Sequence, residues 1–259
     1  MTLYTNHSRG KIAYLCLLTD GLYLQLMKVT FDHADHEAAN ITTFWFKPEK
    51  AMNYTAGQYI ELTLKHKKPD DRGQKRWFTL SSAPELPLVS ITTKLSEPGS
   101  SFKRALQQLR PGQLLYMSEA MGDFVLPKFI TQPLIFVAGG IGLTPFHSMF
   151  EWLGHHQEQR NIRFIYDVKN EDEIIFQDSW KRADIHSTVI VSDPSDAWGG
   201  ERGQLTSELI LGLSQPSDDS LIYISGPEPL VEKLEKELLA SGLKHHQLVT
   251  DFFPGYTTF

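Results

Sequence analysis

Cysteine and long apolar runs are what this sequence has least of. Its 259 residues include one cysteine, Cys16, and the apolar run nearest to a membrane span covers only residues 12–18. One cysteine excludes a disulfide framework, and also a zinc site or iron–sulfur cluster held by cysteines of this chain alone. A membrane-spanning helix needs about 20 apolar residues, so we expect no span and a cytoplasmic location.

Positive charge is also in short supply. Lys and Arg total 25 against 31 for Asp and Glu, which gives a formal charge of −6, and no block is rich in Lys or Arg. We therefore expect no binding to nucleic acid. The composition is otherwise that of an ordinary globular protein, with 41% hydrophobic and 22% charged residues. At roughly 150 residues per domain, the length predicts about two domains.

The first strand with a clear pattern begins at Met27 and runs through Lys28-Val-Thr-Phe31. We expect residues 1–26 to form an extension outside the folded domains. The polar residues 32–36 are expected to form a loop. Their Asp and His side chains are those of a metal site in composition only, and we expect no metal.

Residues 27–129 have the pattern of an all-β domain. β-Branched and aromatic residues fill 41–46, and residues 59–64 alternate apolar with polar. Residues 76–80, 88–94 and 114–118 are further strand candidates, separated by turn residues. Several short strands at this spacing predict an antiparallel Greek-key β-barrel. One short helix interrupts them, with Ser100 or Ser101 as its N-cap.

Residues 130–259 have a different pattern, in which strands alternate with helices. Residues 134–138 are a continuous apolar run, typical of a strand that is buried on both faces of a parallel sheet. Strand candidates follow at 162–166, 187–191 and 221–225, with helix candidates at 145–155, 173–182, 206–211 and 229–241. Such alternation predicts a doubly wound parallel α/β domain, so the fold class is β + α/β.

The stretch Arg76-Trp77-Phe78-Thr79 carries the first chemical signal. Alternate side chains share one face of a strand, so Arg76 and Phe78 point together. A guanidinium offers a planar fork to phosphate, the ring offers a stacking surface, and the Thr79 hydroxyl can donate to a ring nitrogen. The set suits a nucleotide with a flat ring, although an edge strand with a solvated arginine remains an alternative.

Three turns rich in small residues follow. Gly99-Ser100-Ser101 opens a helix and exposes free N–H groups to an anion, or is simply a cap. Residues 138–146 lead from a buried strand through Gly139, Gly140 and Gly142 into a helix, as a dinucleotide site requires. Ser225-Gly226-Pro227 follows another buried strand and should face the same crevice. Tight turns between strand and helix are the alternative for both glycine stretches.

In this order, these stretches resemble the ferredoxin–NADP reductase superfamily. Residues 76–79 are similar to its Arg-x-Tyr-Ser flavin motif, residues 139–145 to its pyridine-nucleotide loop, and residues 225–227 to its Cys-Gly-Pro turn. Residues 57–59 and 121–124 also match. The resemblance covers about residues 27–253. It implies an FAD-binding barrel at 27–129 and an NAD(P)-binding domain at 130–259, without an iron–sulfur domain.

The resemblance also implies roles for individual residues near the flavin. Arg76 and the turn Gly99-Ser100-Ser101 would hold the FAD pyrophosphate. Trp77 and Phe78 belong to the flavin motif. Phe78 would lie against the isoalloxazine, and Thr79 would lie near N5 of that ring. Backbone from Ile91 to Thr93 would meet the ribityl chain. Asp251-Phe252-Phe253 resembles a terminal acid–x–aromatic motif, which implies a place for Asp251 and Phe253 near the flavin, although a capping carboxylate is an equal alternative.

The nicotinamide nucleotide would lie on residues of both glycine turns, namely Gly139, Gly140, Gly142, Thr144, Gly226 and Pro227. Two departures from the family pattern bear on it. Ser225 replaces a cysteine, and a less polarizable serine could slow hydride transfer. Asp193 stands where relatives that use NADP tend to have arginine, so it would repel a 2′-phosphate and favours NADH. A turn-initiating aspartate before Pro194 is the alternative.

The sequence therefore predicts a flavoenzyme that passes a hydride from NADH to bound FAD. Thr79, Ser225 and Asp251 are the candidate catalytic residues. The electrons would go to a separate acceptor, such as a ferredoxin, an oxygenase component, a flavodoxin, a haem protein or a quinone. An electron-transfer subunit of a larger complex, or a non-catalytic flavin- or nucleotide-binding module, are the alternatives.

Overall fold

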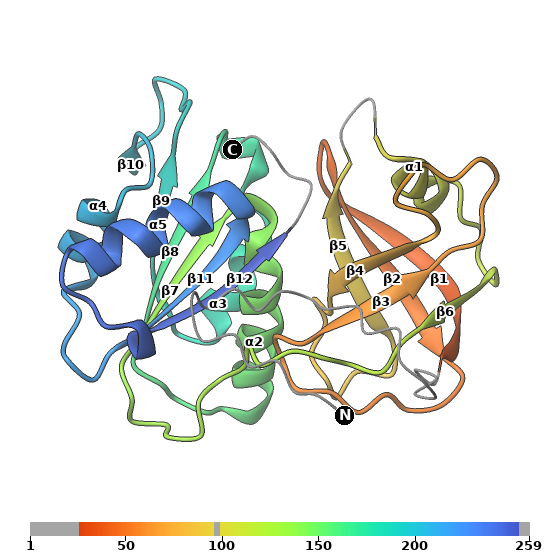
Figure 1. Cartoon of the computed structure of the whole chain (residues 1–259), viewed down its shortest axis with the longest axis horizontal. Helices are drawn as coiled ribbons and strands as arrows, with labels where there is room; N and C mark the ends of the chain where they lie inside the picture. The colour runs from red at the N-terminus through yellow and green to blue at the C-terminus, as the bar shows by residue number, and fades with distance from the viewer. Residues whose placement is uncertain (1–25, 96–98, 254–259) are drawn as a thin grey trace, which may run out of the picture.

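The computed structural model describes residues 26–95 and 99–253. They form two six-stranded sheets that lie side by side, one antiparallel and one parallel (Figure 1). The predicted extension, residues 1–26, lies outside the described residues except for Leu26. Among the helices of the described part, none is both long and apolar enough to cross a membrane.

The first sheet is an antiparallel barrel. Its strands are β1 (Met27–Ala38), β2 (Ile41–Pro48), β3 (Tyr59–Thr63), β4 (Lys75–Thr79), β5 (Val89–Lys94) and β6 (Leu114–Met117). They lie in the order β4-β3-β6-β1-β2-β5, so β6 returns to lie between β1 and β3 in a Greek-key crossing. Just beyond β4, the Ser81 N–H donates to the Ser90 carbonyl of β5 (2.9 Å) and brings the two end strands together. The predicted barrel is confirmed.

A short helix, α1 (Ser101–Gln107), covers one end of this barrel (Figure 1). Phe102 and Leu106 are buried in the barrel core with Phe46, Ile60 and other apolar side chains of the strands. Of the two predicted N-caps, Ser100 is the one used, because its Oγ accepts the Lys103 N–H (3.2 Å). The apolar face of this helix therefore fixes where its first turn lies.

The predicted loop at residues 32–36 is wrong, because β1 continues as a strand to Ala38. The polar side chains are tolerated there because residues 32–36 are exposed, and the pairing with β2 shifts register between Phe31 and His33 and between His36 and Ala38. His33 stacks on Trp45 of β2, with ring centroids 5.8 Å apart. Backbone pairing with β2 therefore overrides the polar composition of this segment.

The second sheet is parallel throughout. Its strands are β7 (Leu134–Gly139), β8 (Ile162–Val168), β9 (His186–Val191), β10 (Glu201–Arg202), β11 (Leu221–Pro227) and β12 (Leu248–Phe253), in the order β10-β9-β8-β7-β11-β12. The α-helices are α2 (Leu143–His156), α3 (Gln177–Arg182), α4 (Ser207–Ser214) and α5 (Glu228–Ala240), and 3₁₀ turns occupy residues 140–142, 171–173 and 245–247. Strands β10 and β12 were not predicted. Of the helix predicted over 173–182, only the part from Gln177 is α-helical.

Helices cover both faces of this sheet, which confirms the doubly wound arrangement. Phe136 and Phe164 pack with α2 and α3 on one face, whereas Ile135, Val137 and Ile165 pack with α4 and α5 on the other. The strand order reverses between β7 and β11. The carboxyl ends of those two strands therefore border the crevice where such folds bind ligands.

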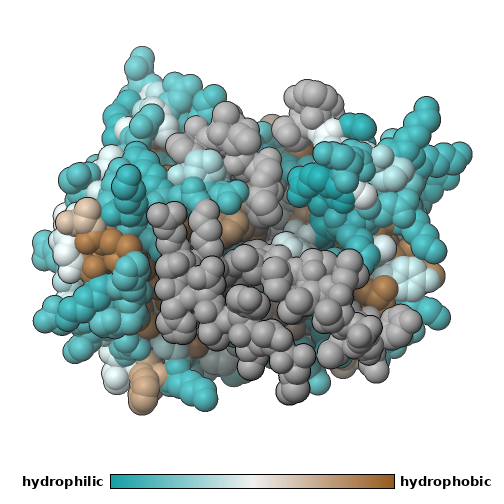
Figure 2. Space-filling model, in the orientation of Figure 1, coloured by the Kyte–Doolittle hydropathy of each residue, from teal (hydrophilic) through white to brown (hydrophobic). Residues whose placement is uncertain are grey.

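The two halves share core packing. Phe124, which follows the barrel strands, lies 5.4 Å from the Phe146 ring of α2 and 5.1 Å from the Tyr223 ring of β11. The Ser148 hydroxyl donates to the Ser82 carbonyl (2.6 Å), and the Tyr223 hydroxyl donates to the Val125 carbonyl (2.8 Å). The coloured surface in the face shown is mainly hydrophilic, with small apolar patches on the side of the parallel sheet and on the barrel side (Figure 2). The domain boundary after residue 129 stays a prediction.

Candidate functional site

A narrow pocket lies where the barrel meets the end of the parallel sheet. Trp77, Phe78 and Thr79 of β4 line one wall with Tyr59, and Asp251, Phe252 and Phe253 of β12 line the other. Five of these residues are predicted site residues, and they come from segments about 170 positions apart in the chain. The pocket holds about 30 Å³. A flavin ring would have to separate the aromatic side chains to enter it.

Strand alternation orients the β4 side chains as predicted. Phe78 and Arg76 both lie against Phe102 of α1, with the Phe78 ring centroid 5.9 Å and the Arg76 Cζ 5.3 Å from that ring. Thr79 is buried, and Trp77 is half exposed on the other side of the strand. Thr79 is thus held at the edge of the pocket.

Asp251 supplies a carboxyl group to this pocket. Burial raises its pKa to about 7, against a hydrogen bond from the Phe252 backbone that lowers it. Asp251 is paired in register with Ser225 on the neighbouring strand β11. A carboxyl group that changes protonation near neutral pH therefore lies between the aromatic pocket and the second glycine turn.

Arg76 is buried, so the alternative of a solvated arginine on an edge strand is wrong. Its Nη1 donates to the carbonyls of Arg72 (2.7 Å), Gly73 (3.2 Å) and Lys75 (2.7 Å). Its Nη2 donates to Asp70 Oδ1 (2.7 Å). Both terminal nitrogens of the predicted phosphate anchor thus have partners within the chain.

The predicted turn at residues 99–101 is likewise engaged internally. The Ser101 N–H donates to Asp70 Oδ2 (3.0 Å), and the Gly99 carbonyl accepts from Arg104. Burial raises the pKa of Asp70, but hydrogen bonds from Ser101 and the charge of Arg76 outweigh it and lower the pKa to about 2. Asp70 is therefore a carboxylate at physiological pH. The sequence analysis missed it.

Ile91 and Thr93 lie on β5 and are buried, with the Ile91 side chain in the barrel core. The Ile91 side chain is therefore not available to a ligand, and a backbone contact from residues 91–93 stays a prediction. Next to it, the Thr92 hydroxyl is bonded to Thr43 and Ser81, both at 2.9 Å. This hydroxyl ladder holds β5 in place beside the pocket.

The two glycine turns touch each other as predicted for a shared crevice. A Cβ at Gly142 would lie 2.1 Å from the Ser225 carbonyl oxygen, and a Cβ at Gly226 would lie 3.3 Å from the Gly139 carbonyl oxygen. Gly139 is closed on its other side by Leu230, whose Cδ2 would lie 2.3 Å from a Cβ at Gly139. The absence of side chains thus lets these two turns pack directly.

Gly140 differs from its neighbours. Its φ of +51° is in the left-handed region that favours glycine, and a Cβ there would meet nothing within 4 Å. With Ile141, Pro227, Asp167 and Lys169, among others, it lines a pocket of about 340 Å³ at the carboxyl ends of β7 and β8. The open backbone at Gly140 fits the close approach of a nucleotide.

Two residues predicted to contact the nucleotide, Thr144 and Asp193, are not among those that line this pocket. The Thr144 hydroxyl donates to the Ile141 carbonyl (3.1 Å) and so stabilises the turn itself. Asp193 is exposed after β9, where its N–H donates to the Lys169 carbonyl (2.8 Å). Its neighbour Ser192 lines the pocket, so Asp193 lies at the pocket rim.

Asp167 and Ser225 carry buried polar atoms with no partner in the described part of the chain, namely Asp167 Oδ1 and Ser225 Oγ. Burial raises the pKa of Asp167 to about 7. Asp167 lines the nucleotide pocket, and the sequence analysis did not select it. An unpaired buried carboxyl oxygen that lines a pocket, as in Asp167, is a group whose hydrogen bond a polar ligand can supply.

Comparison with known proteins agrees with this geometry. The family "Oxidoreductase NAD-binding domain" matches residues 136–236. The chain is 27% identical to NADH oxidoreductase HCR of Escherichia coli over 222 residues, which cover 85% of this chain and 65% of that protein. It is 26% identical to a flavohemoprotein of Oceanobacillus iheyensis, over 84% of this chain and 56% of that protein. The chain thus spans between about half and two thirds of these relatives.

A ferredoxin NADP+ reductase from Neisseria gonorrhoeae, solved with bound FAD and NADP, has the same fold. The TM-score is 0.75 at 18% identity, over 88% of this chain and 98% of that one. The match includes both the antiparallel barrel and the parallel sheet. Residues 136–236 therefore match an oxidoreductase NAD-binding domain, and the two-sheet fold of the chain is that of ferredoxin NADP+ reductases.

Proposed function

We propose that the chain is an FAD-dependent oxidoreductase that takes a hydride from NADH and passes electrons to a separate acceptor. The observation that carries the proposal is the pocket in which Phe78 and Thr79 of the barrel meet Asp251 and Phe253 of the parallel sheet. Aromatic walls fit a flat ring, and the open Gly140 pocket nearby fits a nucleotide. When bound, the two cofactors supply the chemistry, a hydride that moves from nicotinamide C4 to flavin N5.

The residues of the chain then orient and shield the reacting rings. Phe78 and Phe253 would exclude water from opposite walls, and the Thr79 hydroxyl would hydrogen-bond at the ring edge. Gly139, Gly140, Gly142, Gly226 and Pro227 would hold the nucleotide backbone close to the sheet. Ser225, buried and without a hydrogen-bond partner among the described residues, would contact the nicotinamide from β11. Asp251, with its pKa raised to about 7, would hold or release a proton at its carboxyl group near the flavin.

NADH is favoured over NADPH because Asp193 places a negative charge at the pocket rim. Replacing Asp193 with Ala should increase kcat/KM for NADPH about tenfold relative to NADH, since a like charge no longer faces the 2′-phosphate. Asp196→Ala removes an exposed acid three positions along the same loop and is the matched control. A higher kcat/KM for NADPH than for NADH in the unmodified chain would contradict the preference.

The acceptor is proposed only as a class, an electron-transfer protein or a quinone. A second candidate function, the reductase component of a larger assembly, is favoured by the fact that relatives extend well beyond the matched region. Co-purification of the native protein with a stable partner would favour this candidate. We also propose a cytoplasmic location.

The direct test is the visible spectrum of the purified chain before and after anaerobic addition of NADH. Flavin bands that bleach on addition of NADH support the proposal. Bands that persist would mean that the nucleotide pocket does not serve the flavin and would favour a non-catalytic module. No flavin, even after FAD is supplied, would contradict the flavin pocket itself.

A further inference from the structure

Asp70 occupies the position of an external anion at Arg76. Its two carboxylate oxygens are divided between the Arg76 guanidinium (Oδ1 to Nη2, 2.7 Å) and the Ser101 backbone N–H (Oδ2, 3.0 Å). Planar guanidinium and backbone N–H groups are the donors that proteins use for phosphate oxygens. A carboxylate of the chain itself therefore takes the donors that the family resemblance assigns to the FAD diphosphate.

Asp70 also lies on the outer side of this arrangement. Its side chain is 28% exposed, whereas the Arg76 side chain is 8% exposed. The guanidinium packs on Phe102 from within. An anion that approaches Arg76 from solvent therefore encounters Asp70 first.

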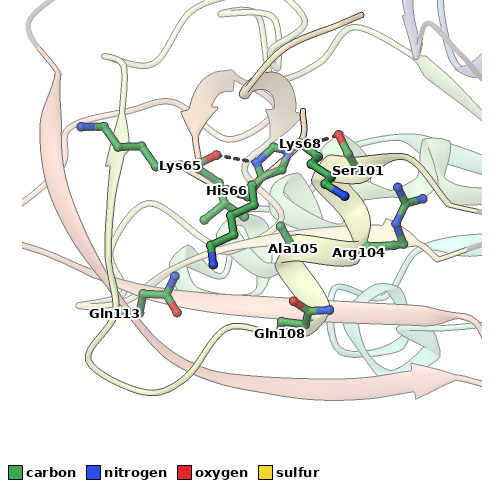
Figure 3. Close-up of a pocket in the computed structure, with 10 residues that line it drawn as sticks. Lys65, His66, Lys68, Ser101, Arg104, Ala105, Gln108 and Gln113 are labelled. Carbon is green, nitrogen blue, oxygen red and sulfur yellow. Dashed lines mark hydrogen bonds between the residues drawn. The ribbon is translucent and has the colours of Figure 1, made fainter. Parts of the chain in front are cut away.

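The contacts around Asp70 hold it in this position. The Asp70 N–H donates to Ser101 Oγ (2.9 Å), and Ser101 Oγ is bonded to His66 Nε2 (3.1 Å). Figure 3 shows His66 hydrogen-bonded to Ser101, with Lys68 and Arg104 beside them. Since His66 Nδ1 donates to the Leu64 carbonyl (2.8 Å), its Nε2 accepts from the Ser101 hydroxyl in the neutral ring. One network thus positions both Asp70 and the N–H group that it accepts from.

The surroundings nevertheless favour an anionic ligand. A pocket of about 450 Å³ adjoins Ser101, and its lining includes Lys65, Lys67, Lys68 and Arg104 but no acidic residue of the described chain. Asp70 is carried by the same segment as the three lysines. The local excess of positive charge attracts a phosphate-bearing molecule, while Asp70 repels it at short range.

We propose that Asp70 competes with the FAD diphosphate for Arg76 and Ser101, so that FAD binds only when the Asp70 carboxylate moves aside. This inference rests on the proposed function. It predicts that the chain discriminates poorly between FAD and a flavin that lacks phosphate, because the diphosphate must displace an internal ligand. It also assigns Asp70 as a residue that determines flavin affinity.

The test compares FAD with riboflavin, which has the same ring system and no phosphate. Dissociation constants are measured for the full chain from the quenching of flavin fluorescence, with apoprotein as the starting material. Asp70→Asn keeps an acceptor for the Ser101 N–H but removes the charge. We expect it to tighten FAD binding about tenfold or more, the effect of removing a like charge within a few ångströms, and to leave riboflavin binding unchanged within about twofold.

Asp71→Asn is the matched control, because Asp71 is exposed and, within the described part of the chain, the ion pair of Arg76 is made by Asp70 instead. It should leave both dissociation constants unchanged. Weaker FAD binding by Asp70→Asn, or an equal change for FAD and riboflavin, overturns the competition. If Asp70→Asn does not fold, Asp70→Ser removes the same charge and should change the ratio of the FAD and riboflavin dissociation constants in the same direction. Binding of neither flavin by any variant would instead overturn the proposed function.

Discussion

Arg76 and Asp167 are buried ionisable residues at opposite ends of the proposed site, and the protein surrounds them differently. Each terminal nitrogen of Arg76 has acceptors within the chain, including Asp70 at 2.7 Å. Asp167 Oδ1 has no partner in the described residues, and neither has Ser225 Oγ on β11. A buried polar atom without a partner costs about 1–3 kcal/mol. Under the proposed function, the nucleotide end would thus retain unsatisfied groups for a ligand, whereas the flavin end would have to give up an internal contact.

The substitution with the largest expected effect lies at the nucleotide end of the proposed site. Gly142→Ala would place a Cβ 2.1 Å from the Ser225 carbonyl oxygen, with Gly226 Cα also within 2.7 Å. Neither backbone atom can move alone, so we expect a loss of about 4 kcal/mol or more of stability. Thermal unfolding followed by circular dichroism measures it.

Gly154→Ala provides the matched control at the other end of α2. A Cβ at Gly154 would meet nothing within 4 Å, and alanine stabilises a helix interior by about 0.5–1 kcal/mol relative to glycine. The two substitutions should therefore shift the melting temperature in opposite directions. Equal shifts would show that the contact between the two turns is not as close as described.

The substitution with the next largest expected effect lies at the flavin end of the proposed site. Arg76→Ala would leave Asp70 without its ion pair and would remove the donor that three carbonyls share, so we expect a loss of about 2–4 kcal/mol in the free energy of unfolding. Urea denaturation of the apoprotein measures this. Lys75→Ala removes a neighbouring ion pair with Glu61 whose lysine is 55% exposed, and it should cost less than about 1 kcal/mol. A similar loss for both variants would mean that the contacts of Arg76 stabilise the fold no more than the exposed ion pair of Lys75 does.

Asp167→Asn tests the nucleotide end through the pH dependence of stability. The pKa of Asp167 is raised from 3.8 to about 7 in the folded protein, so the folded state binds more protons than the unfolded state between these values. Stability that is present at pH 4 is therefore lost as the pH rises towards 7. Asparagine removes this dependence, and we expect Asp167→Asn to be more stable than the unmodified chain by about 2 kcal/mol at pH 8 but not at pH 4.

Melting temperatures of the two proteins at pH 4, 6 and 8 check this expectation. Asp172→Asn changes an exposed acid five positions away and should show no such pH-dependent difference. If the difference between Asp167→Asn and the unmodified chain stays constant with pH, Asp167 does not titrate near neutrality in the folded protein.

The smallest effect concerns Ser225. Its hydroxyl is buried without a partner among the described residues, so Ser225→Ala should raise stability by about 1 kcal/mol in the absence of ligand. The same substitution should weaken NADH binding if the hydroxyl is satisfied by the nucleotide. Equilibrium unfolding and an NADH titration are the two measurements, and a variant that is less stable and binds NADH unchanged would contradict both parts.

The sequence predicted most of the fold because its signals are local. A continuous apolar run marks β7, segments rich in apolar residues mark β8 and β11, and Ser100 and the glycine turns mark the starts of helices. Strand β12 was missed because Thr250-Asp251-Phe252-Phe253 is neither a continuous apolar run nor a clean alternation, and its pairing with β11 decides its structure. The loop predicted at 32–36 failed for the same reason, since pairing with β2 outweighs polar composition.

The candidate site was predictable to the extent that it follows strand ends. Phe78, Thr79, Asp251 and Phe253 do line one pocket. Asp70 could not be found, because its partner Ser101 is 31 positions away and only the tertiary fold brings them together. Asp167 could not be found either, because burial, which raises its pKa, is a property of the folded sheet.

The shared packing of Phe124 with Phe146 and Tyr223 has a consequence for how the molecule denatures. Side chains from the barrel and the parallel sheet belong to one apolar cluster, and the Ser148–Ser82 hydrogen bond adds to it. Neither half can open without exposing the cluster of the other, so the two should melt in a single calorimetric transition. A flavin held by the barrel would then protect the nucleotide-binding half from heat as well.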